Sequence, residues 1–147
     1  MAGVESRSVD SPDETRSPDK TRVDVVRMGS TTAGRFAFEP GWRWADCIKP
    51  VAGTESCRAR HVGVVRSGRL AVRHDDGTEV ELGPGDAYVI EPGHDAWVVG
   101  DEGLSGSSSR RERRRSTRRA SYLCCEQYRA PRFGAEKDQS GGGPAAA

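Results

Sequence analysis

The sequence of 147 residues has few aromatic residues and no long apolar run. Aromatic residues make up 6% of the chain and charged residues 31%, so a good part of it is expected to lie outside any hydrophobic core. No stretch approaches the roughly 18 apolar residues that a membrane-spanning helix needs. The first 22 residues also lack the apolar run of a secretion signal. The sequence therefore predicts one small cytoplasmic domain with no membrane partner.

Cysteine and helical periodicity are scarce as well. The four cysteines have no spacing typical of secreted disulfide scaffolds, so we expect reduced thiols. Residues 23–102 contain no helical pattern of useful length, which argues against an α/β enzyme built on a parallel sheet.

Charge and composition divide the chain into three segments. Residues 1–102 hold 13 Lys and Arg against 18 Asp and Glu, whereas residues 103–147 hold 10 against 4. Residues 1–22 are polar and punctuated by proline, and after residue 102 the chain turns to Gly, Ser and Arg. Neither end has enough apolar residues to offset the entropy cost of ordering. We therefore predict disordered tails at 1–22 and 103–147 around a folded segment, 23–102.

The basic tail has three interpretations. Translation of GC-rich DNA out of frame yields the same Arg, Ser, Gly and Ala bias; a genuine basic tail and an inert linker are the others. Seven arginines in residues 110–119 could attract nucleic acid by counterion release. The cluster has no interleaved aromatic residues on which bases could stack, so nucleic-acid binding is the least favoured function.

The segment 23–102 is a series of short β-type runs, each closed by Gly, Pro, Asp or Ser. The sequences DDG at 75–77 and GPGD at 83–86 are typical of tight hairpin turns. Short strands at close spacing predict an all-β barrel or sandwich. The runs are VDVVRM, GRFAFEPGWRW, CRARHVGVV, RLAVRH, TEVEL, DAYVIEP and AWVVG.

Two stretches of this segment resemble the motifs of the cupin superfamily. RSGRL at 66–70 is similar to the turn of the first cupin motif, and LGPGD at 82–86 with PGH at 92–94 is similar to the second. The texture of the whole segment resembles short bacterial cupin-domain proteins. The resemblance implies an all-β, cupin-type double-stranded β-helix or jelly-roll barrel that could pair as a homodimer. It does not choose among isomerases, dioxygenases, storage proteins and sugar sensors.

The resemblance also implies a metal site inside the barrel. Aligning the first motif, H-x-H-x3-E-x6-G, on its last glycine places the ligand positions at Glu55, Cys57 and His61. The histidine of the second motif falls on Ala96; His94 lies two residues earlier and would need a different loop path to point inward. A thiolate, an imidazole and a carboxylate suit zinc, with iron, manganese or nickel as the other divalent candidates.

Strand alternation supplies an independent argument for a pocket. Cys57 and His61 share one face of the run 57–65, and two arginines that favour solvent share the other. We therefore expect Cys57 and His61 to point into the barrel beside small residues that leave room for a ligand. His94 and Trp97 follow a Pro-Gly turn at the expected mouth, and we add them to the pocket.

Each of these residues also has a purely structural interpretation. Cys57 and His61 could be a core thiol and a hydrogen-bonded imidazole in a pocket without metal. Glu55 could be a solvated loop carboxylate. Trp42 and Trp44 could pack as core rather than form an aromatic wall over a ligand.

The leading functional hypothesis is a small-molecule-binding cupin of regulatory or accessory type, with or without a divalent ion. The alternative is a metal-dependent isomerase, decarboxylase or dioxygenase in which Glu55, Cys57 and His61 hold the ion. The missing second-motif histidine argues against the enzyme. So does the shortage of acid–base groups, since Glu91 is the only carboxylate near the expected mouth.

Overall fold

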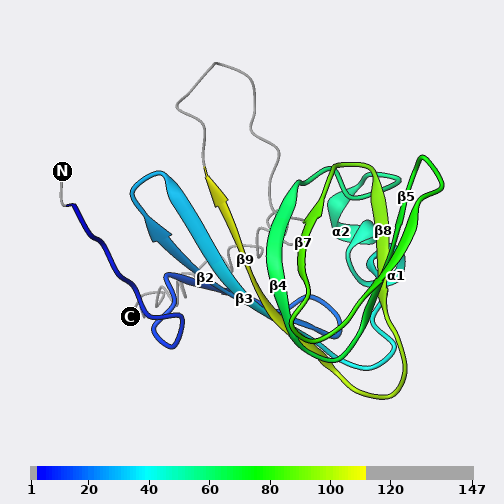
Figure 1. The fold of residues 1–147 in the computed structure, drawn as a ribbon, viewed down its shortest axis with the longest axis horizontal. Helices are drawn as coiled ribbons and strands as arrows, with labels where there is room; N and C mark the ends of the chain where they lie inside the picture. The colour runs from blue at the N-terminus through cyan, green and yellow to red at the C-terminus, as the bar shows by residue number, and fades with distance from the viewer. Residues whose placement is uncertain (1–2, 112–147) are drawn as a thin grey trace, which may run out of the picture.

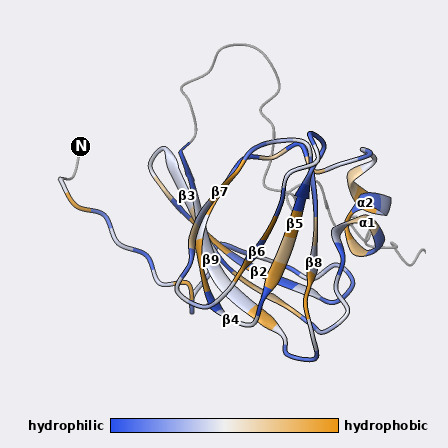
Figure 2. Cartoon of the chain, turned by 45° about the vertical axis from the view of Figure 1, so that its right-hand side comes forward, coloured by the Kyte–Doolittle hydropathy of each residue, from blue (hydrophilic) through white to orange (hydrophobic). Residues whose placement is uncertain are grey.

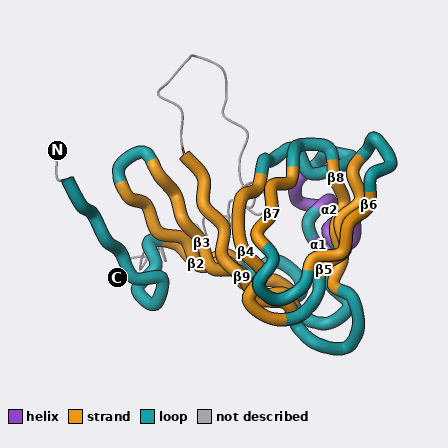
Figure 3. The backbone as a smooth tube through the Cα atoms, in the orientation of Figure 1, coloured by secondary structure: helices purple, strands orange, loops and turns teal. Residues whose placement is uncertain are grey.

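The computed structural model describes residues 3–111. In that part of the chain the strands are β1 (Glu14–Arg16), β2 (Thr21–Met28), β3 (Thr31–Phe38), β4 (His61–Ser67), β5 (Leu70–His74), β6 (Glu79–Leu82), β7 (Ala87–Ile90), β8 (His94–Val98) and β9 (Leu104–Arg111). Two one-turn helices, α1 (Trp44–Cys47) and α2 (Lys49–Ala52), lie beside β8 (Figures 1 and 3). None of the helices in residues 3–111 is long and apolar enough to cross a membrane.

The strands form two antiparallel sheets, which confirms the all-β prediction. The larger sheet has the order β1-β2-β3-β9-β4-β7, and the smaller has the order β6-β5-β8. The predicted turn at 75–77 joins β5 to β6 within the smaller sheet. The turn at 83–86 instead carries the chain from β6 in one sheet to β7 in the other. This crossing closes the barrel seen in Figure 1.

Strand β9 occupies the centre of the larger sheet, outside the predicted boundaries of 23–102. It pairs with β3 from Leu104 to Arg111 and with β4 on its other side. Its Gly- and Ser-rich sequence carries little strand signal of its own, because strand preference depends on the neighbours that a sheet supplies. The folded segment is therefore longer than predicted. The nucleic-acid, linker and out-of-frame interpretations concern mainly residues 112–147, which lie outside the described residues.

The N-terminal segment also lies on the sheet, although we predicted disorder for residues 1–22. β1 pairs with β2, and ion pairs attach the segment to β2 and β3. Arg35 Nη1 lies 2.7 Å from Asp10 Oδ1, and Arg27 Nη2 lies 2.7 Å from Glu14 Oε2. Pattern analysis missed this docking because it rests on charged groups from distant parts of the chain rather than on apolar periodicity.

Asp24 lies at the centre of this contact and is 2% exposed. Its carboxylate accepts hydrogen bonds from Thr15 Oγ1 at 2.8 Å, Arg35 Nη2 at 3.0 Å and Arg22 Nε at 3.3 Å. Burial raises the pKa of Asp24, but these hydrogen bonds lower it by more, so the pKa lies below its ordinary value. The ionised carboxylate therefore stabilises the folded state.

The variant Asp24→Asn is expected to lower the free energy of unfolding by about 2 kcal/mol near neutral pH, because it loses charge-assisted hydrogen bonds. A depressed folded-state pKa gives stability that is present above the unfolded pKa of about 4 and is lost as the pH falls through the folded pKa. Urea unfolding should therefore show a smaller gap between parent and variant at about pH 3 than at about pH 7. Glu102→Gln, at an exposed carboxylate, is the control. An equal gap at both pH values would contradict the assigned role.

The barrel interior combines buried aliphatic residues with aromatic rings, and Figure 2 shows hydrophobic stretches on barrel strands such as β5. Two glycines leave space for two of the rings. A Cβ on Gly106 would collide with the Phe36 ring and lie 2.6 Å from the Val64 carbonyl oxygen. A Cβ on Gly63 would lie 2.6 Å from the Tyr88 hydroxyl oxygen. The side chains of Phe36 and Tyr88 therefore pack directly against the backbone of Gly106 on β9 and Gly63 on β4, where any larger residue would collide with them.

Candidate metal and ligand site

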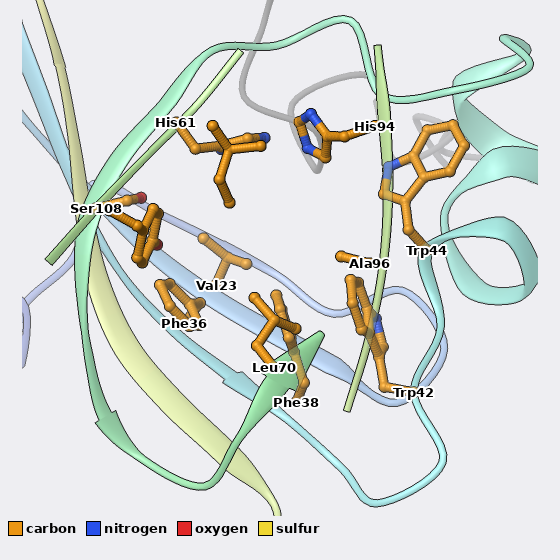
Figure 4. A pocket seen from close by; sticks show the side chains of 12 residues that line it. Val23, Phe36, Phe38, Trp42, Trp44, His61, Leu70, His94, Ala96 and Ser108 are labelled. Carbon is orange, nitrogen blue, oxygen red and sulfur yellow. The ribbon is translucent and has the colours of Figure 1, made fainter. Parts of the chain in front are cut away.

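A partly open cavity of about 80 Å³ lies inside the barrel (Figure 4). Polar groups reach it from His61 on β4, His94 on β8 and Ser108 on β9. The remaining wall is largely apolar, and its aromatic members are Phe36, Phe38, Trp42, Trp44 and Tyr88. Figure 4 shows the two histidines together at one end of the cavity and Phe36, Phe38 and Leu70 at the other.

Three potential metal ligands gather at the histidine end. His61 and His94 line the cavity as predicted, whereas Cys57, also predicted to line it, is not part of the described wall. Cys57, His61 and His94 each offer one donor atom, and these atoms lie within 4.8 Å of one another. The Cys57 Sγ lies 3.4 Å from the His61 Nε2. The rings of His61 and His94 meet edge to face, with centroids 5.2 Å apart.

Backbone pairing brings these residues together from separate segments. Cys57 forms an isolated antiparallel bridge with His94, in which the Cys57 N–H donates to the His94 carbonyl oxygen at 2.8 Å. His61 begins β4, and the predicted alternation is present, since Cys57, Ala59 and Val65 are all buried.

The inward position of His94 corrects the expectation that it would need a different loop path. β8 begins at His94, so His94 and Ala96 lie two residues apart on the same face and are both buried. The Nδ1 of His94 lies 2.7 Å from the Glu91 carbonyl oxygen. Because a carbonyl only accepts, Nδ1 carries the proton and Nε2 is left to bind a metal.

Both imidazoles are neutral at physiological pH. Burial, the neighbouring His94 and the charge of Arg110 lower the pKa of His61 to about 3. Burial is also the main cause that lowers the pKa of His94, against the Glu91 carbonyl, which raises it. Neutral imidazole is the form that binds metal ions.

Cys57 does not follow the expectation of reduced thiols, because it is disulfide-bonded. Cys47, by contrast, is free and buried. Metal ions bind the thiolate rather than a disulfide sulfur. All three donors are therefore available to a metal only when Cys57 is reduced.

Three other residues that we expected at the pocket or its mouth, Glu55, Trp97 and Glu91, do not line the described cavity. Glu55 is 87% exposed in its side chain and pairs with Lys49, with Oε2 and Nζ 2.7 Å apart, so it is not part of the metal cluster. Trp97 lies on the opposite face of β8 from His94, and the guanidinium groups of Arg43 and Arg73 both contact its ring. Its ring does not line the cavity in the described part of the chain.

Glu91, the carboxylate expected near the mouth, also points elsewhere. Its Oε1 accepts a hydrogen bond from Arg60 Nε at 2.9 Å, and the side chain is exposed. Among the cavity-lining residues that the structure describes, none is Asp, Glu, Lys or Arg. The cavity therefore lacks a charged acid–base group of its own.

Sequence reasoning missed two hydroxyl-bearing residues of the cavity, Tyr88 and Ser108. Tyr88 and Ile90 lie two residues apart on the same, more buried face of β7. This strand period of two could have identified Tyr88 as an inward-facing residue. Ser108 belongs to the Gly- and Ser-rich stretch and carried no such signal. Trp42 and Trp44 are buried in the hydrophobic core, as the core-packing interpretation expects, and both also line the cavity.

The donor set suits zinc. In tetrahedral zinc sites the metal–nitrogen and metal–sulfur distances of about 2.0 and 2.3 Å place neighbouring nitrogen and sulfur donors roughly 3.5 Å apart. With Cys57 disulfide-bonded, its Sγ lies 3.4 Å from the His61 Nε2, which is close to that separation. Three protein ligands would leave one coordination position for a ligand from the cavity.

Comparison with known proteins identifies the fold. No family model matches the sequence, and no curated protein matches it. A solved Rhizobium leguminosarum protein of unknown function is 22% identical, with a TM-score of 0.57 over 76% of this chain and 100% of that one. A Silicibacter pomeroyi sugar phosphate isomerase of the cupin superfamily is 16% identical, with a TM-score of 0.52 over 71% and 74%.

A third solved structure agrees with these two. The cupin domain of Schizosaccharomyces pombe Cnp3 is 10% identical, with a TM-score of 0.51 over 74% of this chain and 69% of that one. These similarities, the two antiparallel sheets and the inward histidines lead to one conclusion: the chain has the fold of the cupin superfamily.

Proposed function

We propose that this protein binds a small molecule in its barrel together with a divalent metal ion, and that its role is regulatory or accessory. The observation that carries the proposal is the convergence of Cys57, His61 and His94, two of which, the histidines, line one end of an apolar cavity. In the reduced protein these three residues hold the ion and leave a position that faces the cavity. The ion supplies an attachment point for an oxygen-bearing ligand.

Binding fits the cavity better than catalysis does. A metal-dependent isomerase, decarboxylase or dioxygenase commonly needs a second group that moves a proton. The described cavity-lining residues include no carboxylate or amine, and burial raises the pKa of Tyr88 to about 12, so its phenol stays protonated. The sugar phosphate isomerase activity of the Silicibacter protein is accordingly not part of the proposal.

Zinc binding tests the proposal directly. The full chain, purified without chelators and kept under a phosphine reductant, is expected to bind zinc near one equivalent by elemental analysis. Thermal unfolding should shift upward with added zinc, since a ligand at about 1,000 times its Kd adds about 4 kcal/mol of stability. His61→Ala and His94→Ala should each weaken zinc binding by at least about 100-fold, because even outer-shell changes cost 10–100-fold.

Two matched controls separate the site from general effects. His74→Ala removes a histidine outside the cluster, and Glu55→Ala removes the carboxylate that pairs with Lys49; both should bind zinc like the parent. The parent kept without reductant should bind zinc more weakly than the reduced protein. A folded, reduced parent that binds no more zinc than His61→Ala would refute the metal site.

A further inference from the structure

The hydroxyl group of Tyr88 stands out among the polar groups of the cavity. Tyr88 lines the cavity from β7, and its side chain is partly buried. No hydrogen bond joins its hydroxyl to another residue in the part of the chain that the structure describes. The side chain is partly rather than fully buried, so its hydroxyl keeps accessible surface on which it can take a hydrogen-bond partner. The cavity is the place from which a ligand could supply that partner.

The backbone holds the Tyr88 hydroxyl beside β4. Tyr88 is the antiparallel partner of Gly63, and a Cβ at Gly63 would lie 2.6 Å from the phenol oxygen. His61 lies two residues before Gly63, on the same inner face of β4. Two residues of a strand span roughly 7 Å. The Tyr88 hydroxyl, beside Gly63, and the His61 side chain therefore lie along the same short stretch of β4 in the cavity wall.

The electrostatic character of the cavity favours one negative charge at the histidine end. Arg110 lies two residues after the cavity-lining Ser108 on the same face of β9, so a cationic side chain stands beside this wall. No acidic side chain lines the described cavity, and a bound divalent ion would add positive charge there. Apart from the hydroxyl groups of Tyr88 and Ser108, the rest of the described wall is aromatic and aliphatic. Within that part of the chain it offers no further charged group to a phosphate and no row of donors to a sugar.

We propose that the ligand is a small monocarboxylate with an apolar body, and that Tyr88 is a specificity-determining residue that donates a hydrogen bond to one of its oxygens. The inference deepens the proposed function, on which it rests. The cavity of about 80 Å³ is far below the roughly 300–1,000 Å³ of sites for drug-sized ligands, so the body is small. Phe36, Phe38, Trp42 and Leu70 supply the apolar contacts.

Calorimetric titration with benzoate, benzamide and ribose 5-phosphate tests the inference on the reduced, zinc-supplemented full chain. Benzoate is expected to bind more tightly than benzamide, its neutral counterpart, and ribose 5-phosphate to bind more weakly than either. Tyr88→Phe keeps the ring and removes only the hydroxyl, so benzoate should bind it at least about 10-fold more weakly. Trp97→Phe, on the outer face of β8, should bind benzoate like the parent.

The outcomes separate this inference from the metal proposal, because zinc content is measured on the same samples. Zinc retained with equal benzoate affinity in parent and Tyr88→Phe would overturn the inference and leave the metal site standing. If the reduced, zinc-supplemented protein takes up no zinc but still binds benzoate in a way that depends on Tyr88, the inference would be supported and the metal site refuted. Tighter binding of ribose 5-phosphate, or no benzoate binding at all, would overturn the assigned ligand class.

Discussion

A chain that ends at Glu102 is expected not to fold. It lacks β9, which lies between β3 and β4 and pairs with both of them. Without it the larger sheet separates into two parts with unpaired edges, and the buried Leu104 side chain is removed from the core. The loss should exceed the whole stability of a small domain, about 5–15 kcal/mol. Circular dichroism and urea titration should show no cooperative unfolding transition.

A chain that ends at Arg111 provides the control. It keeps every strand pairing of the described residues and should unfold cooperatively, with a far-ultraviolet spectrum typical of β-structure. Comparing the two truncations assigns the effect to residues 103–111 rather than to the remainder of the chain. A cooperative transition in the chain that ends at Glu102 would show that the barrel closes without β9.

The variants Gly106→Ala and Gly63→Ala are each expected to destabilise the fold by about 3 kcal/mol or more. A methyl group at Gly106 would overlap the Phe36 ring and approach the Val64 carbonyl oxygen to 2.6 Å. A methyl group at Gly63 would overlap the Ser107 carbonyl oxygen. Overpacking costs about 1–3 kcal/mol when side chains can move, and paired backbone moves less readily. Urea unfolding of the purified variants measures the loss.

Gly83→Ala is the matched control for both variants. Its Cβ would meet only the Asp86 carboxylate, at an ordinary 3.8 Å. The stability of this variant should lie within about 0.5 kcal/mol of the parent, as for most surface substitutions. Parent-like stability in Gly106→Ala would mean that the strands can separate enough to admit a side chain, and the close approach of β4 and β9 would have to be revised.

The architecture of residues 23–102 could be predicted because its signals are local. Short alternating runs closed by turn residues identify strands wherever they pack, and tight turns such as 75–77 need only their own residues. The two strands that lie outside this range, β1 and β9, were missed for the opposite reason. β9 has a Gly- and Ser-rich sequence, and β1 is held by pairing with β2 beside ion pairs from distant residues. Neither strand has a local sequence pattern that predicts which strands it pairs with.

For the candidate site as well, local strand geometry was predictable from the sequence, whereas contacts between distant segments were not. Alternation alone placed Cys57 and His61 on the inward face, because a strand has a fixed period of two residues. The sequence did not show that Cys57 would bridge to His94, that Glu55 would turn to Lys49, or that Tyr88 would cross Gly63. Each of these contacts joins residues whose spacing along the chain does not specify their separation in space.

By itself, the sequence determined that this chain is an antiparallel β protein and which side of the 57–65 run faces inward, since both follow from short-range backbone geometry. Only the tertiary structure decided the extent of the barrel and the membership of its site. Strand order and the crossing from β6 to β7 are set by hydrogen bonds between distant segments. Those long-range pairings bring Cys57, His61 and His94 close to one another beside the cavity and leave Trp97 on the outside.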